Sequence, residues 1–122
     1  MREILFRGKD KKTGEWRFGF YRVGSFRKNA MIDCPYSPVS YEVTHETVGQ
    51  HTGLKDKNGV KIFEGDIVRH FEKEKLLVRW SDNQCAFVAF EEIPLTPKES
   101  GRYWEVIGNI HDNPELFLRR QM

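Results

Sequence analysis

One stretch of the chain, residues 47–68, constrains the fold more than any other, because turn-forming and strand-forming residues alternate through it. It reads T-V-G-Q-H-T-G-L-K-D-K-N-G-V-K-I-F-E-G-D-I-V. Asn58-Gly59 is a strong signal for a tight hairpin turn with positive φ at both central residues, which Asn and Gly tolerate best. Gly65 and Asp66 then break the chain again before the next apolar residues. The stretch therefore predicts short strands joined by tight turns, with structural roles for all four residues.

Strand patterns continue beyond this stretch. Apolar segments at residues 76–80 and 85–90 follow charged or polar turns. Short strands in succession, separated by frequent turns, are typical of an antiparallel sheet that curls into a small barrel. We therefore expect a mainly β fold with an antiparallel SH3-like barrel over residues 47–110. Cys85, at the start of an apolar run, is expected to be a small buried side chain.

The first thirty residues predict a hairpin, because residues 4–7 and 16–21 flank a polar turn. Trp16, Phe18 and Phe20 alternate with other residues in the second strand. A strand has a side-chain period of two, so these three large rings lie on one face. We expect that face to form part of the core.

The end of the chain predicts a short helix. Asn113 is a good N-cap, Pro114 suits the first helical position and Glu115 favours the positive end of the helix dipole. Before it, we expect an irregular connection and a turn up to residue 102, then a last strand at residues 104–110.

With 122 residues, the chain is long enough for one domain made of two small subdomains. We expect an N-terminal β subdomain at residues 1–46. A barrel-like subdomain with the terminal helix then covers residues 47–122.

Basic residues concentrate in residues 1–30, although the net charge of the whole chain is only +2. Such asymmetry is typical of a protein that binds an anionic partner or that forms an oligomer contact between unlike faces. Solvated strand edges also collect lysine, however, and this explanation is favoured. Basic residues interleaved with an exposed aromatic ring nevertheless suit phosphate neutralisation and base stacking. The candidate anion or nucleic-acid face comprises Arg7, Lys9, Lys11, Lys12, Arg17, Tyr21, Arg27 and Lys28.

The sequence predicts no catalytic residues, no metal site and no cofactor. The four histidines lack the i, i+4 spacing and the nearby cysteines of a metal site, and no nucleophile triad, Walker loop or dinucleotide fingerprint is present. Cys34 and Cys85 are far apart in sequence and are expected to be thiols. No apolar run approaches the length of a membrane-spanning helix, so we expect a soluble cytoplasmic protein with no membrane partner.

Several segments resemble, in the same order, the pattern of one known family. They are M-R-E-I-L-F-R-G-K at residues 1–9, G-E-W-R-F-G-F-Y at 14–21, the stretch 47–68, V-I-G-N-I at 106–110 and N-P-E-L at 113–116. The family is YopX, small proteins encoded by phages and prophages of bacteria. The resemblance implies such an origin, and with it the cytoplasm of a bacterial host. It implies no activity and no catalytic residues.

We therefore expect a phage accessory protein that binds without catalysis, as a protein-binding or self-associating module. A short chain this rich in aromatic residues leaves apolar surface that oligomerisation covers. The alternative is a nucleic-acid-binding β-barrel protein that uses the basic N-terminal face. The salt dependence of binding distinguishes the two alternatives, because the affinity of phosphate contacts falls steeply as the salt concentration rises.

Overall fold

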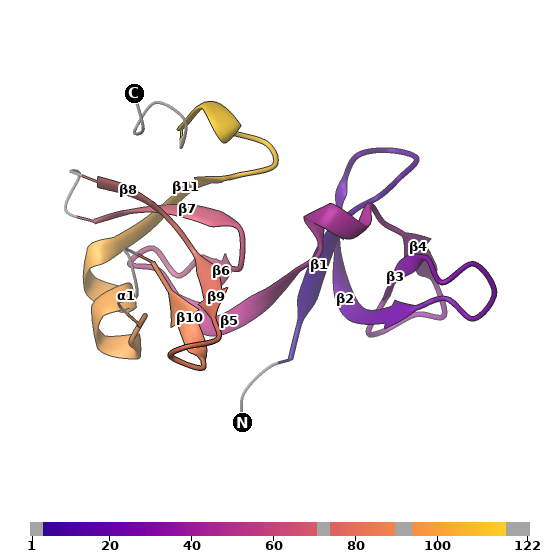
Figure 1. Cartoon of the computed structure of the whole chain (residues 1–122), viewed down its shortest axis with the longest axis horizontal. Coiled ribbons are helices and arrows are strands. Elements are labelled where there is room, and N and C mark those ends of the chain that lie inside the picture. The colour runs from indigo at the N-terminus through magenta and orange to yellow at the C-terminus, as the bar shows by residue number, and fades with distance from the viewer. Residues whose placement is uncertain (1–3, 71–73, 90–93, 117–122) are drawn as a thin grey trace. The chain divides into compact units, whose positions relative to one another are not determined.

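The computed structural model describes residues 4–70, 74–89 and 94–116, and it confirms a mainly β fold with antiparallel strand pairs (Figure 1). The chain forms two compact units, Met1–His51 and Thr52–Met122. The expected division lay between residues 46 and 47. The observed one falls inside a strand, β5 (Gly49–Lys55).

The first unit is a curled antiparallel sheet with strand order β4-β3-β2-β1-β5. Its elements are β1 (Phe6–Lys9), β2 (Trp16–Val23), β3 (Ala30–Asp33), β4 (Ser40–Glu42), a 3-10 turn (His45–Thr47) and the start of β5. The hairpin expected from the first thirty residues is confirmed by the pairing of β1 with β2. Past the end of β4, a bridge between Asp10 and Val43 and a hydrogen bond from the Lys11 N–H to the Glu42 carbonyl bring the chain back to β1.

The core of this unit lies on one face of the sheet. Ala30, Ile32 and Val43 are buried there, and Phe6 and Tyr21 pack against them. Ile32 lies directly opposite Tyr21 in the β2–β3 register. The face of β2 that carries Tyr21 therefore faces the core.

The expected burial of the other face of β2 is wrong. Phe18 and Phe20 are 47% and 52% exposed, whereas Gly19 between them is buried. A Cβ at Gly19 would lie 2.1 Å from the backbone oxygen of Asp33, and a glycine inside a strand marks such a close approach. Because β3 approaches Gly19 so closely, the face of β2 that carries Gly19 packs against the core. Phe18 and Phe20 therefore lie on the opposite, exposed face.

The second unit contains a three-stranded sheet in the order β11-β7-β8, the hairpin β9–β10, and β6 beside β5. Its elements are β6 (Lys61–Phe63), β7 (Asp66–His70), β8 (Glu74–Leu77), β9 (Arg79–Ser81), β10 (Ala86–Val88), α1 (Pro97–Tyr103) and β11 (Trp104–Asn109). Its buried core comprises Ile62, Val68, Leu76, Val78, Ala89 and Trp104.

The SH3-like barrel expected over residues 47–110 is not confirmed, because the sheets do not close within the described residues. β8 and β9 are separated at Val78, whose N–H bonds back to the Asp66 carbonyl. A helix, α1, occupies residues expected to be an irregular connection. Pro97 begins it, as proline favours a first helical position as readily as a loop.

The turn at Asn58-Gly59 is in the predicted place, but its type is different. Gly59 has a φ of +81°, whereas Asn58 does not have a positive φ. The Gly59 N–H bonds to the Asp56 carbonyl, and the Asp56 carboxylate accepts the N–H groups of Asn58 and Val60. This is a three-residue loop with one left-handed residue, so the prediction of two positive-φ residues is wrong.

Gly65 lies in the turn between β6 and β7, and Asp66 is the first residue of β7. Gly65 has a φ of +95°, and the buried Asp66 carboxylate accepts the N–H of Phe63 at 2.7 Å. Cys85, by contrast, is exposed with a φ of +52°, so its expected burial is wrong: it ends a turn, and the strand begins one residue later.

The expected C-terminal helix begins at Pro114 and is described as far as residue 116. Residues 117–122, where the prediction continued, lie outside the described residues. The Asn113 side chain accepts the N–H of Asn109 at 3.3 Å. It therefore binds the end of β11.

Candidate binding face

The face of the first unit's sheet that lies away from the core carries a row of rings beside two cations. We call Arg7, Lys9, Trp16, Phe18 and Phe20 the outer strip. Lys9 lies opposite Trp16 and Arg7 opposite Phe18 in the β1–β2 register. Directly opposed residues of an antiparallel pair share a face, so all five side chains belong to the face of the sheet away from the core.

The two cations of the outer strip pack against Trp16. The guanidinium carbon of Arg7 lies 4.5 Å from the centroid of the Trp16 ring, and the Lys9 Nζ lies 5.6 Å from it. Both are within the reach of a cation–π interaction. Arg7 is buried and Lys9 half-buried, so positive charge is held beside the two exposed phenylalanine rings.

On the β3 side of the outer strip, an acidic side chain is paired with a basic one. Asp33 lies opposite Phe20, and its carboxylate contacts Arg22 Nε at 2.8 Å and Ser40 Oγ at 2.7 Å. The hydrogen bond from Ser40 and the interaction with Arg22 lower the pKa of Asp33, against the opposing effect of burial. The outer strip therefore has two cations beside Trp16 along β1 and a paired carboxylate along β3.

Two of the predicted basic residues meet at Glu42. Lys11 Nζ lies 3.2 Å and Arg27 3.4 Å from the Glu42 carboxylate oxygens. Hydrogen bonds from Lys11 and then from Asn29 lower the pKa of Glu42. The turn after β1 and the loop after β2 thus place their cations around one carboxylate.

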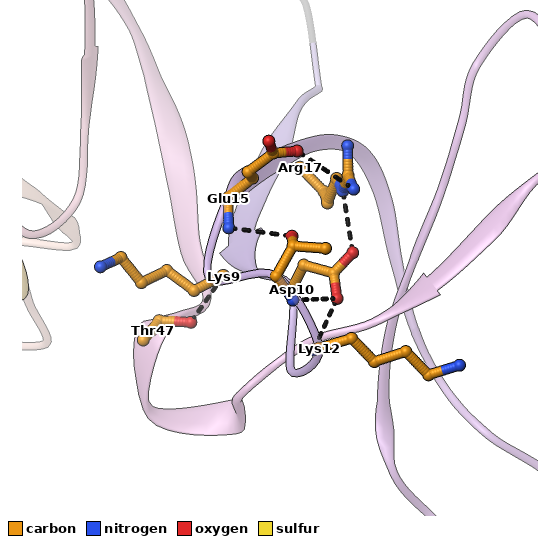
Figure 2. Close-up of polar contacts among 7 residues, drawn as sticks. Lys9, Asp10, Lys12, Glu15, Arg17 and Thr47 are labelled. Carbon is orange, nitrogen blue, oxygen red and sulfur yellow. Dashed lines mark hydrogen bonds and ion pairs between the residues drawn. The ribbon is translucent and has the colours of Figure 1, made fainter.

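Arg17, near the start of β2, binds the turn that joins β1 to β2. Its guanidinium contacts Asp10 Oδ2 at 3.0 Å and Glu15 Oε2 at 3.3 Å (Figure 2), and it stacks 4.1 Å from the centre of the Tyr41 ring. The guanidinium of Arg17 is therefore paired with the two carboxylates of the turn.

Asp10 organises the same turn. Its Oδ1 accepts the N–H groups of Lys12 and Thr13. The hydrogen bond from Lys12 is the largest cause of the lowered pKa of Asp10, opposed by burial and supported by Arg17. Figure 2 shows the side chains of Lys9 and Lys12 pointing away from this carboxylate, in opposite directions.

The structure divides the predicted basic face among several places. Arg7 and Lys9 lie on the outer strip, while Arg17 and Tyr21 lie on the opposite face of β2, where the Tyr21 ring is 5.7 Å from that of Phe6. Lys12 and Lys28 are exposed in the turn after β1 and the loop after β2. The predicted residues therefore do not form one surface.

Phe18 and Phe20 lie at the surface, although the sequence pattern predicts them in the core. The sequence shows that the two rings share a face of β2, but this alternation does not determine which face is buried. Gly19 between them was the available signal, because a glycine flanked by two aromatic residues in a strand indicates that the glycine side is the crowded one.

Among the described residues, no group of three or more His, Cys, Asp or Glu side chains is placed to hold a metal ion. No helix in the same part of the chain has the length and apolar character needed to cross a membrane.

Comparisons with known proteins support a family and a fold. A family model described as YopX protein matches residues 5–118. The crystal structure of protein EF1440 from Enterococcus faecalis is similar, with 24% sequence identity and a TM-score of 0.61, over 95% of this chain and 99% of that one. At this identity the likeness shows the fold alone. No curated protein sequence matches the chain.

Proposed function

The chain belongs to the YopX family, and on this premise we propose that it is a non-catalytic binding protein whose partner docks on the outer strip. The observation that supports this is the exposure of Phe18 and Phe20, side by side on β2. The core lies on the other face of the strand, so these rings are not part of it. Exposed aromatic surface of this kind marks interaction sites.

The biological setting is part of the same proposal. The resemblance to phage and prophage proteins supports an accessory role during phage growth in the bacterial cytoplasm. A protein partner or a second copy of the chain is the occupant that the sequence favours, since aromatic surface on a short chain is readily covered by association.

The proposal is tested with the double variant Phe18→Thr/Phe20→Thr, which keeps strand-forming residues in β2. Light scattering after size exclusion measures self-association, and cross-linking in bacterial lysate measures partner retention. The matched control is Tyr36→Thr, which removes an almost fully exposed ring from the loop after β3.

The wild type is expected to assemble or to retain a partner, the double variant to lose this, and the control to behave as the wild type. Surface substitutions change stability by about 0.5 kcal/mol or less, so the melting temperatures of all three should be close. A double variant that assembles and retains partners as the wild type does would refute the proposal, as would a wild type that does neither.

A further inference from the structure

We propose that a second surface of the first unit binds an acidic segment of a protein partner. This surface, which we call the loop cluster, comes from the turn after β1 and the loop after β2, and it comprises Lys11, Lys12, Phe26, Arg27 and Lys28. It shares no residue with the outer strip. The inference therefore goes beyond the proposed function, because it adds a docking surface and states the chemistry of the segment that occupies it.

The first argument is the position of the two loops. Lys11 Nζ lies 3.2 Å and Arg27 Nη2 lies 3.4 Å from carboxylate oxygens of Glu42, at the end of β4. A hydrogen bond from the Asn29 side chain reaches the same carboxylate. One acidic side chain therefore holds the turn after β1 and the loop after β2 next to each other, and their basic residues form one surface.

The second argument is the charge of the loop cluster. Two of its cations share the single carboxylate of Glu42. The other two, Lys12 and Lys28, are exposed and form no ion pair with another described residue. The two acids of the turn after β1 contact Arg17 instead. Positive charge therefore exceeds negative charge at this surface, which favours an acidic partner.

The third argument is the conformation of the loop after β2. Phe26 is 100% exposed, so its ring packs against no other described residue. The loop is nevertheless closed by a hydrogen bond of 2.8 Å from the Gly24 N–H to the Asn29 carbonyl. Lys28 has a φ of +51°, a left-handed conformation that favours glycine or asparagine. The loop thus presents an apolar ring and a basic side chain in a defined conformation, which lowers the entropic cost of binding.

The combination favours a protein segment over other polyanions. Glu42 lies among the cations, where it would face the unbroken row of phosphates of a nucleic-acid strand. A protein segment can place its carboxylates opposite Lys12 and Lys28 and an apolar side chain against Phe26. Protein interfaces combine buried aromatic anchors with charged pairs in this way. The loop cluster therefore fits an acidic segment that also carries apolar residues.

The test uses the full chain and labelled probes. One probe is a peptide built from repeats of Asp-Glu-Leu-Glu, and a second is the same peptide with Asn and Gln in place of its acids. A third is a single-stranded oligonucleotide with the net charge of the acidic peptide. Fluorescence anisotropy is followed at several salt concentrations. We expect the acidic peptide to bind more tightly than either other probe, with affinity that falls as salt screens the exposed charges.

Charge variants locate the binding. Lys12→Gln/Lys28→Gln should weaken binding of the acidic peptide by about fivefold or more and reduce its salt dependence. The matched control is Lys55→Gln/Lys57→Gln, which removes two exposed lysines of the second unit and should bind as the wild type. Glu42→Gln should instead tighten binding by about twofold or more, because both cations that share this carboxylate become available to the peptide.

A ring variant tests the apolar part of the site. Phe26→Thr should weaken binding of the acidic peptide by about threefold or more, because the apolar contact with leucine is lost. Tyr36→Thr is the matched control, since it removes an exposed ring from the loop after β3. It should bind as the wild type.

The inference is wrong if the acidic peptide does not bind at low salt, or if the uncharged peptide binds equally well. It is also wrong if the double lysine variant or Phe26→Thr binds as tightly as the wild type. Tighter binding of the oligonucleotide than of the acidic peptide would overturn it too and would make the loop cluster a nucleic-acid surface. The Phe18→Thr/Phe20→Thr variant should bind the acidic peptide as the wild type does, so failure of the outer-strip proposal and failure of this one are measured separately.

Discussion

At the residue scale, the Asp56 carboxylate joins two segments of the second unit, a role that the sequence pattern does not predict. It is buried, and its Oδ1 accepts the N–H groups of Asn58 and Val60 across the turn. Its Oδ2 accepts the N–H of Val106 in β11 at 2.9 Å. One side chain therefore shapes the hairpin and attaches it to a strand 50 residues away in sequence.

Replacing Asp56 by alanine should lower the free energy of unfolding by about 2–4 kcal/mol, because buried amide groups would lose their acceptor. Urea unfolding measures the change. Asp56→Asn keeps one acceptor oxygen and should cost less. Equal stability of the alanine variant and the wild type would show that water replaces the carboxylate at no cost.

The turn itself gives a second prediction. Gly59→Ala places a side chain at a φ of +81°, and nothing lies within 4 Å of the new Cβ, so its cost is that of the backbone conformation, about 1–2 kcal/mol. Asn58→Ala should cost clearly less, because Asn58 does not have a positive φ. Thermal unfolding of the two variants checks the order, and the reverse order would favour the primed turn.

At the element scale, β2 shows how tightly the first unit is curled. Gly19 approaches the backbone of β3 so closely that no side chain fits between them. The alternation that places Gly19 and Tyr21 inside also places the rings of the outer strip outside. The position of the candidate binding face thus follows from a packing constraint on the opposite side of the same strand.

Gly19→Ala should therefore destabilise the protein strongly, by about 3 kcal/mol or more, since a backbone atom cannot move aside as a side chain can. Circular dichroism with chemical denaturation measures the loss. A stability within about 1 kcal/mol of the wild type would mean that β2 and β3 separate easily.

The opposite result is expected in α1. Gly101 is helical, and a Cβ there meets nothing within 4 Å. Alanine is favoured over glycine in a helix by about 1 kcal/mol, so Gly101→Ala should raise the melting temperature. No change, or a decrease, would show that α1 contributes little to the stability of the fold.

At the scale of the whole molecule, carboxylates paired with basic groups make stability depend on pH. The pKa values of Asp10, Asp33 and Glu42 lie below their ordinary values of 3.8, 3.8 and 4.5. Folding therefore favours their ionised forms. The stability they contribute is fully present above the ordinary pKa values and is lost as the pH falls through the lower values of the folded state.

We accordingly expect the melting temperature to be nearly constant between about pH 6 and 7 and to decrease below about pH 4. Calorimetry across this range measures the effect. Asp10→Asn should melt lower than the wild type at neutral pH and lose less on acidification. A parallel decrease in both proteins would exclude Asp10 from the acid sensitivity.

Features encoded by near neighbours were predictable from the sequence. The strand-rich pattern, the hairpin of β1 and β2, the position of the turn at Gly59 and the helix start at Pro114 were identified from patterns of a few residues. Each of them depends on local backbone preferences: which residues tolerate positive φ, which lack a donor and which alternate along a strand.

Features that depend on distant contacts were decided by the tertiary structure. Both sides of β2 carry aromatic residues, so alternation alone left its buried side undetermined. The close approach of β3 at Gly19, and the packing of Tyr21 against Ile32 and Val43, selected it. The same packing placed the basic residues of the N-terminal segment on different faces. It also left Phe18 and Phe20 at the surface, because the face of β2 that carries Gly19 is the one that β3 approaches closely.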